Sequence, residues 1–193
     1  MLFWVHSAQT RSRKFVFLDR DGVINEDRPD YIKHWEEVRF YPDALEALRR
    51  LNEMDVQVIL ISNQSGLNRG IIGSEAFRDI HRRMVRHIRD CGGDVLAAFY
   101  CPHMPHEHCR CRKPAPGMIR KASGIFGIPL ENTFMIGDRW TDVEAAENAG
   151  CRAILLDRSE ETQPHGVSAS EIEKRGLMRF SNLSLAVEEA WKH

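Results

Sequence analysis

Five short apolar runs punctuate the chain, and segments with a helical hydrophobic period separate them. The runs are rich in Val, Ile, Leu and Phe and are too short for buried helices, so each one predicts a buried strand. Because strands alternate with helices, the pattern predicts an α/β fold with one mainly parallel sheet and helices on both faces. The predicted strands cover residues 15–18, 56–61, 95–100, 133–136 and 153–156.

Between these runs apolar residues recur every three or four positions, which predicts amphipathic helices. Thr141 and Glu144 have the spacing of a capping box, and Gly150 is expected to end the helix that they begin. The other helices are expected to start at Pro42, to follow a cap at Ser74, and to cover residues 116–126 and 183–191.

Two segments lack this periodicity. Residues 1–13 show no useful pattern, and we expect them to form a loosely ordered arm, to which we assign no function. Residues 25–39 are polar and aromatic, too irregular for a helix and long enough to fold over a site at the sheet edge. The second segment is therefore a candidate substrate loop.

Composition narrows the class of protein. The 193 residues are 42% hydrophobic and 28% charged, which is typical of one globular domain spanning residues 1–193. A formal net charge of −1 provides no overall basic field, so we expect no nucleic acid or membrane partner, and we interpret the arginines of residues 78–89 as a solvated helix face. No apolar run could span a bilayer and residues 1–5 are too short for a secretory signal, so a cytoplasmic location is expected.

Two carboxylates directly follow the first apolar strand. Asp19 and Asp21 are two positions apart, so in an extended chain they point to one side and can converge on a point. Two converging carboxylates repel each other unless a cation intervenes, and Mg²⁺ prefers such oxygen ligands. A turn without chemistry is the alternative, whereas an EF-hand loop is excluded because Ile24 occupies the position that requires glycine.

Two further strands end in polar or acidic groups. Ser62 and Asn63 follow one of them, and Asp138 follows another, with Asp142 four residues on. The carboxyl ends of parallel strands meet at one edge, where Lys113 on a nearby loop could join them. A Mg²⁺ ion bound by Asp19, Asp21 and Asp138 would screen a phosphate, to whose oxygens Lys113 and Ser62 could donate. This combination favours phosphoryl transfer.

A loop of cysteines and histidines follows the third predicted strand. Three thiolates and one imidazole form a tetrahedral Zn²⁺ set with no position left for water, which is typical of a structural site. His106 and His108 are second choices to replace the histidine of this set, and a loop of free thiols is the alternative interpretation. The predicted zinc ligands are Cys101, His103, Cys109 and Cys111.

These motifs together resemble the four motifs of the haloacid dehalogenase superfamily. They are D-x-D-G-V at Asp19, the strand-ending Ser62, the lysine of R-K-P at Lys113, and G-D-x-x-x-D at Asp138. The resemblance implies a Rossmann-like three-layer sandwich and an aspartyl-phosphate mechanism. In it Asp19 would be the nucleophile and Asp21 the acid and base, while Asp142 would support the metal ligands.

Within this superfamily the chain is similar to the small phosphatases without a cap domain. C-x-H … C-x-C-R-K-P resembles the bisphosphate and histidinol-phosphate phosphatases, and N-Q-S-G followed by R-G is similar to the D-glycero-D-manno-heptose 1,7-bisphosphate 7-phosphatases. The resemblance favours an enzyme that removes the 7-phosphate of a small-molecule sugar bisphosphate; histidinol-phosphate hydrolysis and a non-catalytic zinc-stabilised binding module are the alternatives. We expect the protein to be a monomer. The expected substrate contacts are Asp27, Arg28, Tyr31, Asn63, Gln64, Ser65, Arg112 and Arg139.

Overall fold

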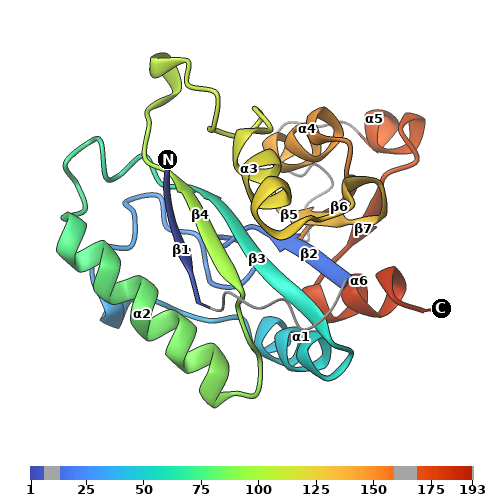
Figure 1. Cartoon of the computed structure of the whole chain (residues 1–193), viewed down its shortest axis with the longest axis horizontal. Coiled ribbons are helices and arrows are strands. Elements are labelled where there is room, and N and C mark those ends of the chain that lie inside the picture. The colour runs from blue at the N-terminus through green and yellow to red at the C-terminus, as the bar shows by residue number, and fades with distance from the viewer. Residues whose placement is uncertain (7–13, 159–168, 193) are drawn as a thin grey trace.

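The computed structural model describes residues 1–6, 14–158 and 169–192, and in these ranges the strands form one seven-stranded sheet. The strand order is β1-β4-β3-β2-β5-β6-β7, and every neighbouring pair is parallel except β1 and β4 (Figure 1). The strands are β1 (Leu2–Val5), β2 (Lys14–Leu18), β3 (Val56–Asn63), β4 (Ala97–Cys101), β5 (Phe134–Gly137), β6 (Arg152–Leu156) and β7 (Met178–Phe180).

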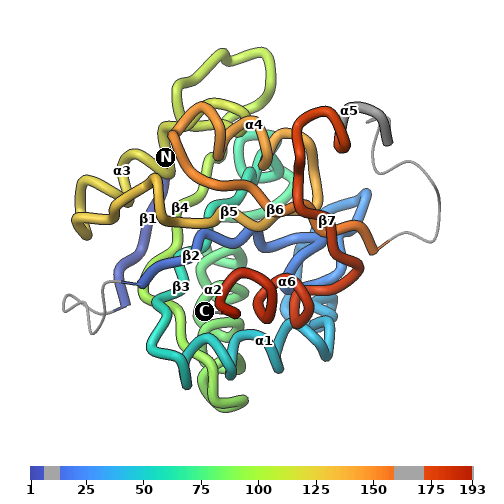
Figure 2. Tube along the Cα trace, turned by 90° about the vertical axis from the view of Figure 1, so that its right-hand side faces the viewer, coloured from blue at the N-terminus to red at the C-terminus, as the bar shows by residue number. Residues whose placement is uncertain are grey.

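Helices cover both faces of this sheet, so the predicted three-layer α/β fold is confirmed (Figures 1 and 2). None of the described helices combines the length and the hydropathy that crossing a bilayer requires. One face carries α1 (Pro42–Glu53), α2 (Ser74–Asp90) and α6 (Leu183–Ala190), and the other carries α3 (Gly117–Phe126), α4 (Trp140–Ala149) and α5 (Ala169–Lys174).

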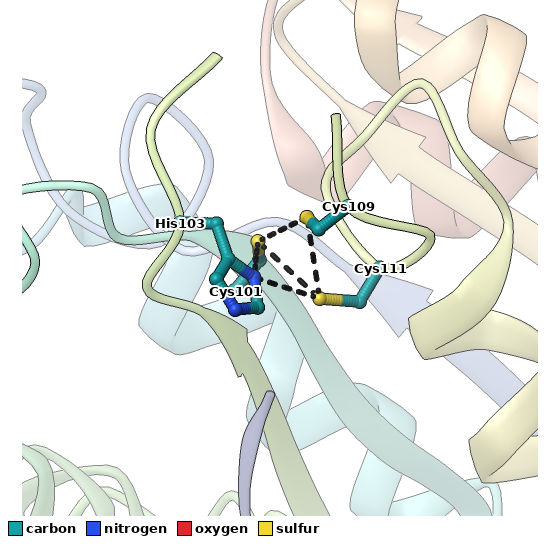
Figure 3. Close-up of side chains that lie close together, drawn as sticks. All are labelled: Cys101, His103, Cys109 and Cys111. Atoms are coloured by element: carbon teal, nitrogen blue, oxygen red, sulfur yellow. Dashed lines mark hydrogen bonds between the residues drawn. The ribbon is translucent and has the colours of Figure 1, made fainter. Parts of the chain in front are cut away.

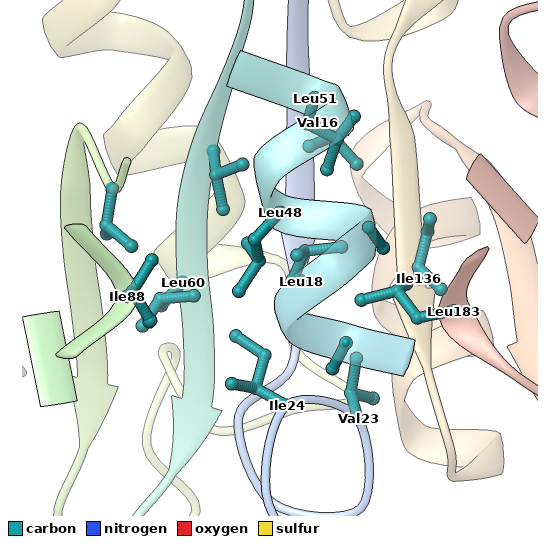
Figure 4. Close-up of a cluster of buried hydrophobic side chains, with 14 of the residues drawn as sticks. Val16, Leu18, Val23, Ile24, Leu48, Leu51, Leu60, Ile88, Ile136 and Leu183 are labelled. Atoms are coloured by element: carbon teal, nitrogen blue, oxygen red, sulfur yellow. The ribbon is translucent and has the colours of Figure 1, made fainter. Parts of the chain in front are cut away.

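The central strand β2 is buried on both sides, which explains its continuous apolar run. Val16 and Leu18 point into the cluster beneath α1, α2 and α6. Leu48 of α1 belongs to the same cluster (Figure 4). Phe15 and Phe17 belong to the opposite cluster, which packs against α3 and α4. Since successive residues of a strand alternate between its faces, the four buried positions of β2 that follow the exposed Lys14 are all apolar.

The chain reverses its direction across the sheet at β2. It first builds β3 and β4 on one side of β2, and then crosses to build β5, β6 and β7 on the other. Such a switch point opens a crevice at the carboxyl ends of the two central strands, where ligands of open α/β sheets bind. Asp19 follows β2 and Asp138 follows β5, so both acids lie at this crevice. The connection from β2 to α1, residues 19–41, carries only a short 3-10 helix (Trp35–Glu37) and no added domain.

The expectation of a loose arm at residues 1–13 is wrong for its first part. Leu2–Val5 forms the edge strand β1, antiparallel to β4, with Leu2 opposite Tyr100 and Val5 opposite Ala97. A four-residue strand is too short for its periodicity to be recognised, and the pairing depends on an edge of β4 that only the folded sheet offers. Residues 7–13 lie outside the described residues.

Two other local predictions are corrected by the structure, and one strand is added. The helix α2 begins one residue earlier than expected, with Gly73 at the capping position and Ser74 inside the helix. The helix α4 begins at Trp140 with Arg139 at the capping position, and the Asp142 carboxylate accepts a hydrogen bond of 3.0 Å from the Arg139 amide; the expected Thr141–Glu144 box does not form. The short strand β7 was not predicted from the polar sequence that follows residue 157.

Candidate functional site

A pocket of about 940 Å³ opens at the carboxyl ends of β2 and β3 and beside the start of α4. It gathers the predicted catalytic and substrate-contact residues from loops that are far apart in sequence. Arg69, which was not among the expected contacts, also lines it. The predicted residues in its wall are Asp19, Asp21, Asp27, Arg28, Tyr31, Ser62, Asn63, Gln64, Ser65, Arg112, Lys113 and Arg139.

Three buried carboxylates meet beside this pocket, and one of them, Asp19, lines it. Asp19, Asp138 and Asp142 each offer an oxygen within 4.8 Å of the others. The Lys113 ammonium lies 2.8 Å from Asp19 and 2.5 Å from Asp142, and it also donates to the carbonyl of Ile61 at 2.9 Å. One lysine therefore faces three acids, so the cluster carries an excess of negative charge in a buried place.

The pKa values of the cluster follow from this arrangement. Burial raises the pKa of Asp19 to about 6, although the Lys113 ammonium opposes the shift. Burial, together with the Asp19 carboxylate, raises the pKa of Asp138 to about 8. For Lys113 burial alone would lower the pKa, but the Asp142 and Asp19 carboxylates outweigh it and raise the pKa to about 12. The Lys113 ammonium therefore stays charged, and it is the one positive group that stabilises the charged forms of these acids within the cluster.

This donor set fits a hard divalent cation. The Oδ1 atom of Asp138 is buried and has no hydrogen-bond partner among the described residues, so one oxygen of the cluster is left for a ligand. Carboxylate oxygens within 4.8 Å of one another suit Mg²⁺. A cation there would offset the repulsion between the carboxylates, which the single Lys113 ammonium offsets only in part.

The structure differs from the sequence prediction at Asp21, whose carboxylate is not part of this group. Asp21 lies beyond Leu18, where β2 ends, and just before the turn at Gly22, so the extended geometry that would align it with Asp19 has already ended. Its oxygens instead accept hydrogen bonds from Arg20 at 2.9 and 2.7 Å, from Asn25 at 2.9 Å and from Gln64 at 2.6 Å. Asp21 thus lines the same pocket as Asp19 from a separate, hydrogen-bonded position.

The loop that carries Lys113 is fixed to the end of β3. Asn63 donates from Nδ2 to the Lys113 carbonyl and accepts at Oδ1 from the Lys113 amide, both at 3.1 Å. Its amide is therefore occupied by the protein, although Asn63 also lines the pocket. Gln64 donates to the Ser62 hydroxyl at 3.1 Å, and Tyr31, at φ 66°, places its hydroxyl 3.3 Å from that of Ser65.

The arginines of the pocket wall differ in whether a carboxylate already pairs with them. Arg28 is paired with Asp30 at 3.1 Å, and Arg139 is paired with Asp27. Among the described residues neither Arg112 nor Arg69 has a carboxylate partner, and Arg112 donates only to the carbonyl of His103, at 3.2 Å. These two guanidinium groups are therefore the ones best able to meet an anion in the pocket.

The four predicted thiolate and imidazole residues converge in a second cluster (Figure 3). The three Sγ atoms lie 3.5 or 3.6 Å apart, and the Nδ1 atom of His103 lies 3.4 Å from Cys101 and 3.3 Å from Cys111. Zn–S bonds of about 2.3 Å in a tetrahedron imply sulfur atoms about 3.8 Å apart, so the cluster has the size of such a site. His106 and His108 are not part of it.

This cluster is directly continuous with the pocket. Cys111 precedes Arg112 and Lys113 in the chain, and His108 and Cys109 line the pocket wall. Any ligand that holds the four side chains together also holds the segment that carries both cations.

Comparison of this chain with known proteins agrees with the geometry of the site. The profile of the HAD-hydrolase-like family matches residues 110–175. The crystal structure of the D,D-heptose 1,7-bisphosphate phosphatase from B. bronchiseptica, complexed with magnesium and phosphate, superposes with a TM-score of 0.81 at 34% identity, over 93% of this chain and 98% of that one. The chain is therefore a hydrolase of the haloacid dehalogenase superfamily.

Curated relatives narrow the class further. The D-glycero-beta-D-manno-heptose-1,7-bisphosphate 7-phosphatase of Bordetella bronchiseptica is 41% identical over 143 residues, which is 74% of this chain and 80% of that protein. The Pseudomonas aeruginosa protein of the same name is 36% identical over 173 residues, 90% of this chain and 95% of that protein. The chain belongs to the D-glycero-D-manno-heptose-1,7-bisphosphate 7-phosphatase family.

Proposed function

We propose that this protein hydrolyses the 7-phosphate ester of D-glycero-D-manno-heptose 1,7-bisphosphate through an aspartyl-phosphate intermediate. The observation that carries the proposal is the buried group of Asp19, Asp138 and Asp142 beside Lys113, of which Asp19 and Lys113 line a pocket that also contains several arginines. Membership of the heptose-bisphosphate phosphatase family supports the same substrate.

In this proposal Asp19 is the nucleophile. One of its oxygens forms a bond to phosphorus while the bond from phosphorus to the sugar oxygen breaks, and Asp21 transfers a proton to that oxygen. Asp21 then accepts a proton from a water molecule, whose oxygen attacks the phosphoaspartate and releases inorganic phosphate together with the free Asp19 carboxylate. The position of Asp21 in the wall of the same pocket, separate from the carboxylate group, supports a role in proton transfer.

Charge on the transferred phosphoryl group would be met by Lys113 and by the Ser62 hydroxyl, both of which line the pocket. Asp19 and Asp138, with Asp142 beside them, are the residues that would hold Mg²⁺. The ion, when bound, neutralises charge on the phosphoryl oxygens. The sequence suggested Asp19, Asp21 and Asp138 as the Mg²⁺ ligands. We propose instead that the Asp21 side chain transfers the proton and does not bind the ion.

The substrate's second phosphate would be bound at the outer part of the pocket. Arg112 and Arg69 are the pocket cations without a carboxylate partner among the described residues, and a guanidinium group binds phosphate through paired hydrogen bonds. The ion pairs of Arg28 with Asp30 and of Arg139 with Asp27 have to rearrange before those arginines could contribute.

We propose that the cluster of Cys101, His103, Cys109 and Cys111 binds a structural Zn²⁺. The donor types and spacings support zinc, and four protein ligands leave no position for a substrate or a reacting water. Its role would be to hold Arg112 and Lys113 at the pocket.

Phosphate release from a panel of substrates tests the function. The purified protein with Mg²⁺ is offered heptose 1,7-bisphosphate, heptose 7-phosphate, histidinol phosphate and p-nitrophenyl phosphate. We expect the highest kcat/KM for the bisphosphate and release of one phosphate per molecule. A preference for histidinol phosphate would show that histidinol phosphate, and not the heptose bisphosphate, is the substrate. A lack of phosphate release from every compound would support the non-catalytic binding module.

A further inference from the structure

Arg158, two residues beyond the end of β6, reaches across the sheet to the turn that carries Asp21. Its Nε donates to the carbonyl of Gly22 at 3.2 Å, and its Nη2 donates to the carbonyl of Val23 at 3.0 Å. It therefore binds two successive peptide groups directly after Asp21, although it lies 135 or more residues away in sequence.

The guanidinium group is itself held rigidly. Asp43 of α1 accepts two hydrogen bonds from it, at 2.9 and 3.0 Å, and the same carboxylate accepts a third, of 2.8 Å, from the Leu183 amide at the start of α6. The Tyr41 ring packs under the guanidinium carbon at 3.8 Å. A paired guanidinium and carboxylate, fixed by two helices, form a firm anchor for a turn.

The turn that is anchored in this way has little freedom in its position. Gly22 has φ 79°, and its amide donates to the Asn25 carbonyl at 2.7 Å. A Cβ atom at Gly22 would lie 2.1 Å from Oδ2 of Asp138, so the backbone of the turn lies against the carboxylate group. A displacement of this turn would move Asp21 relative to Asp19 and Asp138 together.

We infer that Arg158 is a positioning residue, which acts through the backbone of Gly22 and Val23 to keep Asp21 in register with Asp19. The inference rests on the proposed function, because it assigns Arg158 to the alignment of the proton-transfer group. Arg158 does not line the pocket, so its loss should affect the rate of reaction more than the binding of substrate. Misplacement of a catalytic group by about 1 Å can cost on the order of 100-fold in rate.

The test compares Arg158→Met with Arg50→Met. Arg50 joins α1 to α6 through Glu188 and is the matched control, because it also pairs across elements but does not touch the turn. For Arg158→Met, assayed well below its unfolding temperature, we expect kcat to fall by about 10- to 100-fold with KM changed less than about 3-fold. Arg50→Met is expected to keep the wild-type kcat.

A second variant guards against failure of Arg158→Met to fold. Arg158→Lys keeps one cationic donor but loses the paired geometry, and we expect kcat to fall by about 3- to 10-fold. Wild-type kcat in a folded Arg158 variant, a loss confined to KM, or an equal loss in Arg50→Met would overturn the inference. An inactive wild-type protein would instead refute the proposed function, so the two failures are distinguishable.

Discussion

At the scale of single residues, two aspartates that are two positions apart have opposite surroundings. Asp19 is buried beside Lys113 and two other carboxylates, whereas Asp21 accepts hydrogen bonds from Arg20, Asn25 and Gln64. Different surroundings are what separate the roles of two acids in one site. This contrast supports the proposed assignment of Asp19 as the nucleophile and Asp21 as the proton donor.

Asp19→Asn should abolish turnover and leave the fold intact, because it replaces the attacking oxygen but keeps the shape of the side chain. We expect kcat to fall on the order of 10³-fold or more, measured as phosphate release, with an unchanged circular dichroism spectrum. Asp79→Asn, a change on the surface of α2, serves as the control and should have no effect. Activity within about tenfold of the wild type would refute Asp19 as the nucleophile.

Arg112→Ala should penalise a bisphosphate more than a monophosphate. Its guanidinium lines the pocket and has no carboxylate partner among the described residues, so an anionic group at the far end of the substrate is its expected partner. We expect kcat/KM for heptose 1,7-bisphosphate to fall by about 10- to 100-fold, which corresponds to one charge-assisted contact of about 1.5 to 3 kcal/mol.

Hydrolysis of p-nitrophenyl phosphate by this variant should fall much less. Arg110→Ala is the matched control, because Arg110 is two residues away, exposed and outside the pocket wall. An equal loss for both substrates would mean that Arg112 serves the reacting phosphate, and the argument from Arg112 to a bisphosphate would fail.

At the scale of elements, the loop between β4 and α3 joins the thiolate cluster to the pocket. Its first ligand, Cys101, is the last residue of β4, and its last ligand, Cys111, lies next to Arg112. The Asn68 amide donates to the Glu107 carboxylate at 3.2 and 3.3 Å, which adds a contact between this loop and the loop after β3. A metal in the cluster would therefore order two loops of the pocket at once.

Cys109→Ser should lower zinc content and thermal stability together, because the binding energy of a structural metal is also folding energy. We expect zinc, measured by atomic emission, to fall from about one ion per chain, and Tm to fall by about 5 °C or more. Cys91→Ser removes a thiol outside the cluster and should change neither quantity. Full zinc occupancy in Cys109→Ser would point to His106 or His108 as the true ligand.

At the scale of the whole molecule, the amino-terminal strand β1 forms one edge of the sheet, and beside it the buried His81 meets the half-buried His6. His81 of α2 makes a contact of 2.9 Å with the Tyr100 hydroxyl and one of 3.1 Å with His6, and the Trp4 ring stacks on it at 4.7 Å. Burial, with some repulsion from His6 and Arg20, lowers the pKa of His81 to about 3. The folded state therefore holds His81 neutral.

This burial predicts a specific loss of stability in acid. The unfolded chain protonates His81 below its ordinary pKa of 6.5, whereas the folded chain does not until about pH 3, so the free energy of unfolding falls as the pH falls through this window. Between pH 7 and pH 5 the loss from this one group should be about 2 kcal/mol, measured by urea unfolding.

His81→Gln should remove this part of the pH dependence, because glutamine can hydrogen-bond to Tyr100 without taking up a proton. His87→Gln, on the same helix but outside the pair, is the control and should keep the wild-type slope. Equal pH slopes for the wild type and His81→Gln would show that His81 is not held neutral by the fold.

The sequence by itself determined the elements whose signals are local. The strand-ending acids, the lysine of R-K-P and the paired cysteine spacing all depend on residues close together in the chain, and the direction of parallel strands brings their ends to one edge. For this reason the pocket, the four-residue thiolate and imidazole cluster, and the α/β layers could be predicted before the structure.

Only the tertiary structure decided which groups meet across the sheet. Asp142 rather than Asp21 joins Asp19 and Asp138, because β2 ends at Leu18 and the turn at Gly22 carries the Asp21 carboxylate toward Gln64. The pairing of β1 with β4 and the reach of Arg158 to the Gly22 turn likewise depend on contacts between distant segments, which no local period encodes.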